Sequence, residues 1–269
     1  MSTKLIALDL DGTTLNPAGQ LSSKTRNVLR AASQRGHKVV ITTGRPDNIS
    51  EQFYDQLDLT TPMINFNGAL VHVPHQQWAY EQATTLPQAT ALALLELKHD
   101  FPIKVAIAEG KQFVLTDRPF RDLPFFTDMP APTVLLNADS LQQAPISLSL
   151  FTDAVTLPQL QAAVNQRFPH VVAQTWGAWS GPFSALEIVR EATHKSSAIQ
   201  YLLDYYQMNA RDVLAFGDDD NDRDMLTHAG WGVAMKNARP AIKALANDVT
   251  PLSNADDGVA DYLIRRLAL

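Results

Sequence analysis

The first apolar run of the chain, Leu5 to Leu8, ends directly in two carboxylates, Asp9 and Asp11. An unbroken apolar run of this length is typical of a strand that is buried on both faces of a parallel sheet. Gly12 follows the second carboxylate and allows a tight turn. Ligands of open α/β sheets bind outside the carboxyl ends of the strands, so both aspartates are expected at a functional edge. Two carboxylates this close in a cleft repel each other and favour a bound cation.

The same Asp-Leu-Asp-Gly stretch also fits a simpler role, a polar turn that caps the next helix. Two other named sites do not fit it. An EF-hand loop starting at Asp9 would need Gly and Glu where the chain has Thr14 and Gln20. A Rossmann fingerprint needs three glycines after the strand, and only Gly12 is present. The capping turn therefore stays open on these residues alone.

Apolar strands alternate with amphipathic helices in the first and last parts of the chain, which indicates right-handed crossovers and a parallel sheet. The segment 186–189 is assigned to this sheet. Between about residues 81 and 184 the pattern changes to short strand candidates and a proline-rich passage. The predicted fold is an α/β, Rossmann-like core of residues 1–80 and 185–269, with helices on both faces of its sheet. An inserted α+β cap domain is predicted at residues 81–184. Trp176 and Trp179 lie near the domain junction and fit either the lining of a substrate entrance or packing, which is the commoner role of aromatic residues there.

Composition narrows the function. The formal charge of -6 argues against a nucleic-acid partner, which would select a basic surface. Without cysteine the chain has no disulfide, no thiolate nucleophile and no Cys-ligated zinc. It shows neither a signal-peptide pattern nor an apolar run of membrane-spanning length, so we expect a cytoplasmic protein without a membrane partner. We expect a monomer or a weak homo-oligomer.

Polar clusters end two further buried strands of the predicted sheet. Thr43 and Gly44 follow the strand at 39–41, and Asp218 begins an acidic run after the strand at 213–216. Most charge runs are solvated turns, but a direct junction with a buried strand favours a site. Mg²⁺ prefers oxygen ligands, one carboxylate can act as nucleophile, and a second can move protons. A hydroxyl, backbone N–H groups and Lys195 can hold phosphoryl oxygens, so the set suits phosphoryl transfer.

In this order, the clusters resemble the four motifs of the haloacid dehalogenase superfamily: Asp9-x-Asp11-Gly12-Thr13, Thr43-Gly44-Arg45, Lys195 and Gly217-Asp218-x-x-Asn221-Asp222. Asn67-Gly68 and the stretch 232–238 are similar to Cof-type phosphatases with a class IIB cap. The resemblance implies a Mg²⁺-dependent phosphoric monoester hydrolase. Its implied substrates are small phosphorylated metabolites, in particular sugar phosphates.

The resemblance also implies roles for single residues. Asp9 would be the nucleophile, forming an aspartyl-phosphate, and would bind Mg²⁺. Asp11 would be the general acid/base and would offer its carbonyl to the metal, and Asp218 would be the remaining carboxylate ligand. The implied phosphate-binding residues are the backbone of Leu10 together with Thr43, Gly44, Lys195 and Asn221. Arg45 and Asp222 are expected to form ion pairs that support these groups.

Two alternatives remain open for the function. A phosphomutase of the same superfamily would keep the phosphate in the active site, so phosphate release separates it from a phosphatase. A catalytically silent protein that binds a phosphometabolite would have no need of a nucleophile. The presence of Asp9, Asp11, Lys195 and Asp218 counts against the second alternative.

Overall fold

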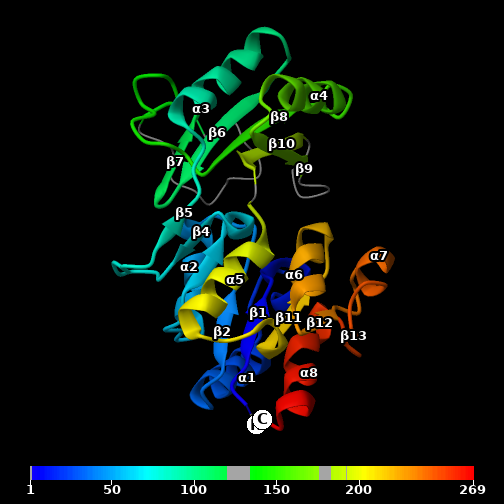
Figure 1. Ribbon diagram of the computed structural model, residues 1–269. Coiled ribbons are helices and arrows are strands. Elements are labelled where there is room, and N and C mark those ends of the chain that lie inside the picture. Colours follow the sequence, from blue (N-terminus) through cyan, green and yellow to red (C-terminus); the bar gives the residue numbers. More distant parts are fainter. Residues whose placement is uncertain (1, 120–133, 176–182, 192) are drawn as a thin grey trace. The chain divides into compact units, whose positions relative to one another are not determined.

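The structure is a computed structural model that describes residues 2–119, 134–175, 183–191 and 193–269. The chain forms two compact units. The core unit contains Met1–Gln82 and Thr193–Leu269, and the cap unit contains Ala83–Ala192 (Figure 1). Trp176 and Trp179 lie outside the described residues. None of the described helices is long and apolar enough to cross a membrane.

The core unit is built on a five-stranded parallel sheet in the order β13-β12-β11-β1-β2. Its strands are β1 (Leu5–Leu8), β2 (Lys38–Ile41), β11 (Val213–Gly217), β12 (Trp231–Ala234) and β13 (Asp248–Val249). Its helices are α1 (Ser23–Gln34), α2 (Asp47–Gln56), α5 (Lys195–Tyr206), α6 (Arg223–His228), α7 (Pro240–Lys243) and α8 (Gly258–Leu267). Every residue of β1 is fully buried, so both faces of the sheet are covered. The predicted α/β fold with a parallel sheet is confirmed.

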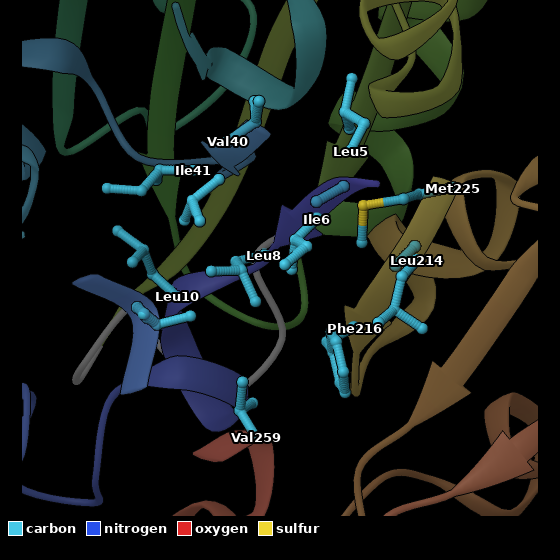
Figure 2. Packing of buried hydrophobic residues seen from close by; sticks show 14 of the residues in the cluster. Leu5, Ile6, Leu8, Leu10, Val40, Ile41, Leu214, Phe216, Met225 and Val259 are labelled. Carbon is cyan, nitrogen blue, oxygen red and sulfur yellow. The ribbon is translucent and has the colours of Figure 1, made fainter. Parts of the chain in front are cut away.

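Local sequence explains how the helices of the core unit pack. Ser22 accepts a hydrogen bond from the Thr25 N–H at the start of α1, as an N-cap residue does. Helix α1 buries one apolar face and packs against α8. On one face of the sheet, the ring of Phe216 contacts the ring of Tyr262 in α8 edge-on, with ring centroids 5.5 Å apart. Figure 2 shows the side chains of β1, β2 and β11 in one cluster with Met225 of α6 and Val259 of α8.

The strand order brings together segments that are far apart in the chain. Because β1 lies between β2 and β11, the residues that follow these three strands meet at one edge of the sheet. A parallel bridge between Thr42 and Ile64 places β3 (Met63–Asn65) beside the end of β2. Strand β3 pairs with β4 (Leu70–His72), which is followed in the order β3-β4-β5 by β5 (Gln82–Ala83). The turn Phe66–Gly68 connects β3 to β4.

The cap unit contains an antiparallel sheet in the order β7-β6-β8-β10-β9. Its strands are β6 (Val105–Gly110), β7 (Phe113–Thr116), β8 (Ser147–Thr152), β9 (Val171–Thr175) and β10 (Ser184–Arg190). Helices α3 (Gln88–Leu95) and α4 (Leu157–Arg167) pack their apolar side chains on this sheet. The unit is thus a separate α+β body with its own hydrophobic core.

The placement of residues 185–190 differs from the sequence-based expectation. We expected the segment 186–189 to resume the parallel core sheet. Instead, β10 pairs antiparallel with both β8 and β9 and therefore belongs to the cap sheet. The chain returns to the core unit only at Thr193. An apolar strand in the middle of a sheet reads the same from its sequence in either sheet, and only the pairing distinguishes them.

Candidate active site

The loop after β1 holds Asp9 in a buried position at the carboxyl edge of the sheet. The Asp9 N–H donates to the carbonyl of Phe216 at 3.1 Å, which continues the pairing of β1 with β11. Gly12 then turns the chain with φ of 71°. A Cβ at this position would lie 2.2 Å from Oδ2 of Asp218, so the loop and Asp218 approach closely only because residue 12 is glycine. Thr13 Oγ1 donates to Oδ1 of Asp218 at 2.9 Å, which links the ends of β1 and β11.

Lys195, the first residue of α5, brings the main positive charge to this edge. Its side chain is fully buried, and Nζ lies 2.7 Å from Oδ1 of Asp9 and 2.7 Å from Oδ1 of Asp222. Burial lowers the pKa of the lysine, but the two carboxylates outweigh burial and leave the pKa above its ordinary value. Lys195 is therefore a charged ammonium with one N–H left after its two ion pairs.

Asp222 is held by the backbone that follows β11. Its Oδ2 accepts the N–H groups of Asp218 at 2.8 Å and of Asp219 at 3.2 Å, while Oδ1 accepts from Lys195. The ion pair expected for Asp222 is thus present, with Lys195 as the partner. Asp222 fixes the loop that presents Asp218 and at the same time aligns the lysine with Asp9.

The carboxylates at this edge fit a hard cation. Asp9, Asp218 and Asp222 each offer an oxygen, and these oxygens all lie within 4.8 Å of one another. Burial, and next the charge of Asp222, raise the pKa of Asp9 well above its ordinary value. Burial and Asp222 likewise raise the pKa of Asp218 to about 7. One lysine thus does not balance the negative charge of the three carboxylates. A set of oxygen donors with excess negative charge fits a divalent metal ion.

The Asp11 side chain pairs with Arg45 and not with Lys195. Both of its carboxylate oxygens accept from Arg45, from Nε at 2.7 Å and from Nη2 at 2.6 Å. The guanidinium also lies over the ring of Phe53, 5.6 Å from the ring centroid. A bidentate pair of this kind fixes direction as well as charge. The Asp11 side chain is therefore absent from the three-carboxylate group, although its backbone stays in the same loop.

The loop after β2 places a hydroxyl beside these groups. Thr43 Oγ1 accepts the N–H of Arg45 at 3.1 Å, so the threonine proton is left to donate to another acceptor. A Cβ on Gly44 would lie 3.0 Å from Oδ1 of Asn67. Asn221 donates from Nδ2 to that same Oδ1 at 3.0 Å. Every residue predicted for the site lies in the core unit, after β1, β2 or β11 or at the start of α5.

Two asparagines, Asn67 and Asn237, support the site. From the sequence we named them only within segments that resemble Cof-type phosphatases and gave neither a role. Asn237 donates from Nδ2 to the carbonyl of Gly12 at 2.7 Å and accepts the N–H of Asn254. Asn67 accepts from Asn221, as described above. The signal for Asn67 was present in the sequence, because an Asn-Gly pair between two apolar runs favours left-handed backbone. Its side-chain partner could not be read from that signal.

Comparisons with known proteins show which family the chain resembles in sequence and fold. A family model described as haloacid dehalogenase-like hydrolase matches residues 6–263. The 5-amino-6-(5-phospho-D-ribitylamino)uracil phosphatase YitU of Bacillus subtilis is 33% identical over 267 residues, which cover 98% of each chain. The pyridoxal phosphate phosphatase YbhA of Escherichia coli is 30% identical over 276 residues, covering 99% of this chain and 100% of the relative. The crystal structure of a haloacid dehalogenase-like hydrolase from Bacteroides thetaiotaomicron shares the fold, with a TM-score of 0.86 and 24% identity, over 98% of this chain and 100% of that one.

Proposed function

This chain belongs to the haloacid dehalogenase-like hydrolase family, and we propose that it is a Mg²⁺-dependent phosphatase of small phosphorylated metabolites, in particular sugar phosphates. Both relatives described above carry the name phosphatase, so the reaction class is hydrolysis of a phosphoric monoester. The names of these relatives give a phosphorylated ribitylaminouracil and pyridoxal phosphate as their substrates, and both compounds are small molecules. They support the substrate class and leave the individual substrate open.

We assign the nucleophile to Asp9. An oxygen of its carboxylate forms a bond to phosphorus while the bond from phosphorus to the leaving oxygen breaks, which gives an aspartyl-phosphate. Lys195 supports this assignment because its ion pair at 2.7 Å favours the ionised form of Asp9, against burial and the charge of Asp222, and directs the carboxylate. A buried carboxylate without such a partner would take up a proton and lose its nucleophilicity.

We assign proton transfer to Asp11. As an acid it gives its proton to the leaving oxygen, and as a base it then takes a proton from the water that attacks phosphorus. The second step breaks the bond between Asp9 and phosphorus and releases inorganic phosphate. Both oxygens of Asp11 accept from Arg45 in this structure, so the acid step requires the carboxyl group to turn away from that arginine.

Asp9, Asp218 and the carbonyl of Asp11 would hold the metal. Bound Mg²⁺ would supply positive charge that lets a phosphate dianion approach a carboxylate. The fit rests on oxygen donors and on the pKa of Asp218, which burial and Asp222 raise to about 7. Asp222 is the third carboxylate of the group, but its hydrogen bonds to the backbone and to Lys195 suit a supporting role better.

The phosphoryl group would be held by donors from the segments that meet at this edge. They are the remaining N–H of Lys195, the Thr43 hydroxyl, the backbone of Leu10 and Gly44, and the amide of Asn221. Selection among metabolites is assigned to the cap unit, since every chemical group named here lies in the core unit. A cap that closes over bound substrate would exclude water until the acid/base is in position.

The observation that carries this proposal is the buried ion pair of Lys195 with Asp9 at the carboxyl end of β1. The test is a screen of the purified chain with Mg²⁺ against phosphorylated metabolites and p-nitrophenyl phosphate, scored by release of inorganic phosphate. We expect phosphate release by the native chain and none by Asp9→Asn. Transfer of phosphate between positions of a sugar without release would instead indicate a phosphomutase. A chain that binds these compounds and turns none of them over would be a silent binding protein.

A further inference from the structure

The turn Phe66–Gly68 touches three of the polar segments that form the candidate active site. All three of its residues have positive φ, with 49° at Phe66, 54° at Asn67 and 105° at Gly68. Only glycine adopts this region freely, and a run of such residues persists only where its surroundings hold it. Its contacts therefore define what the turn does.

Three contacts, two hydrogen bonds and one packing contact, connect the turn to the loop after β2. The Asn67 N–H donates to the carbonyl of Thr43 at 3.1 Å, and the Phe66 N–H donates to the carbonyl of Arg45 at 3.2 Å. The Asn67 side chain packs directly on Gly44, where a Cβ would lie 3.0 Å from Oδ1 and 3.1 Å from Nδ2. Gly44 is thus small so that the amide of Asn67 can lie against it.

A fourth contact joins the turn to the start of α5. A Cβ on Gly68 would lie 2.3 Å from the carbonyl oxygen of His194, the residue before Lys195. This approach leaves no room for a side chain at position 68. The turn is therefore packed against the backbone that positions the buried lysine.

A fifth contact, a hydrogen bond from Asn221, determines the direction of the Asn221 side-chain amide. Asn221 is exposed, and its Nδ2 donates to Oδ1 of Asn67 at 3.0 Å. A carboxamide presents donors on one side and an acceptor on the other, and only the donor side suits a phosphate oxygen. With its NH₂ group bound to an acceptor, Asn221 keeps its second N–H as a donor in a defined direction. Without that acceptor, an exposed amide would rotate and would present its oxygen to the anion for part of the time.

We propose that Asn67 is a positioning residue of the phosphate site, which holds the Asn221 carboxamide with its NH₂ group available to a phosphoryl oxygen. This inference rests on the proposed function, because it assigns Asn221 to the phosphoryl group. Asn67 acts through Asn221 and is not itself a catalytic residue.

The probe is inorganic phosphate, whose binding is measured by calorimetry in the presence of Mg²⁺ and as product inhibition of p-nitrophenyl phosphate hydrolysis. The variant Asn67→Gly removes the acceptor and tolerates the left-handed backbone. We expect its affinity for phosphate to fall about tenfold, as for loss of a well-directed hydrogen bond to a charged group. The variant Asn221→Ala should lose a similar factor.

The effects of the two substitutions on the free energy of phosphate binding should not add. If Asn67 acts through Asn221, then Asn67→Gly in the Asn221→Ala background should change phosphate affinity by less than about twofold. The control is Gln207→Gly, at an exposed residue with φ of 54° at the end of α5. It makes the same kind of backbone change and should leave phosphate affinity unaltered.

The inference is overturned by unchanged phosphate affinity in Asn67→Gly, or by effects of the two variants that multiply. It is also overturned if Asn221→Ala binds phosphate as the native chain does, a result that does not depend on whether an Asn67 variant folds. The proposed function fails separately, if the native chain itself neither hydrolyses a phosphoester nor binds phosphate.

Discussion

Replacing Lys195 tests the charge balance of the site most directly. The ammonium is fully buried and bridges Oδ1 of Asp9 and Oδ1 of Asp222, each at 2.7 Å. Lys195→Met keeps much of the length and volume of the side chain but removes its charge. Two buried carboxylates would then face each other without a cation, in a group that already includes Asp218.

The expected loss is large. Removing one partner of a buried ion pair costs about 3–5 kcal/mol, because the remaining charge stays buried and unpaired. In a domain of this size about 1 kcal/mol shifts the melting temperature by about 2–4 °C. Lys195→Met should therefore melt about 6–20 °C below the native chain when followed by calorimetry at pH 8 with a chelator present.

Two further measurements separate charge from packing. The control is Lys4→Met, because Lys4 pairs with Asp212 at 3.5 Å and both side chains are partly exposed. Pairs of this kind contribute less than about 1 kcal/mol, so this variant should melt close to the native chain. Lowering the pH to about 5.5 should restore part of the stability of Lys195→Met, since Asp9 can then become neutral by taking up a proton. A Lys195→Met chain that melts within about 2 °C of the native one at pH 8 would refute the reasoning.

Three other outcomes are expected. Asp9→Asn should lower kcat by several orders of magnitude, by analogy with nucleophile knockouts of about 10⁶-fold. Its melting temperature should stay the same or rise, because Lys195 keeps its ion pair with Asp222 while the crowded group loses one carboxylate. A residual kcat above about a tenth of native, with deamidation ruled out by mass spectrometry, would disprove the assignment of Asp9 as nucleophile. Burial and Asp222 raise the pKa of Asp218 to about 7, above its value in the unfolded chain, so this group disfavours the metal-free fold as the pH rises from about 4 through 7. Mg²⁺ should accordingly raise the melting temperature more at pH 8 than at pH 5.5, and chelation with EDTA should stop turnover. Equal stabilisation by Mg²⁺ at both pH values, or full turnover after chelation, would contradict the metal assignment. Replacing residues 83–192 by a short linker should impair hydrolysis of metabolites far more than that of p-nitrophenyl phosphate, and an unchanged ranking of natural substrates would remove specificity from the cap unit.

The core and the sites that end its strands could be predicted because they depend on local patterns. Leu5–Leu8 and Val213–Phe216 are apolar without interruption, and both are buried strands of the parallel sheet. The carboxylates that follow them needed no tertiary information to be found, since chain direction alone places them at the carboxyl ends of parallel strands. Helix α5 begins at Lys195 and buries Ile199, Leu202 and Leu203, whose helical spacing is a local pattern of the same kind.

The side-chain pairs of the site were decided by the tertiary structure. Asp11 pairs with Arg45 and Asn67 with Asn221, across separations of 34 and 154 residues. These pairs exist because β1 lies between β2 and β11, and a strand order cannot be read from a single strand. The second boundary of the cap unit was misplaced for the same reason, because β10 is as apolar as a core strand and only its antiparallel partners β8 and β9 assign it to the cap sheet. Periodicity reports how deeply a segment is buried, whereas the identity of its neighbours is set by long-range packing.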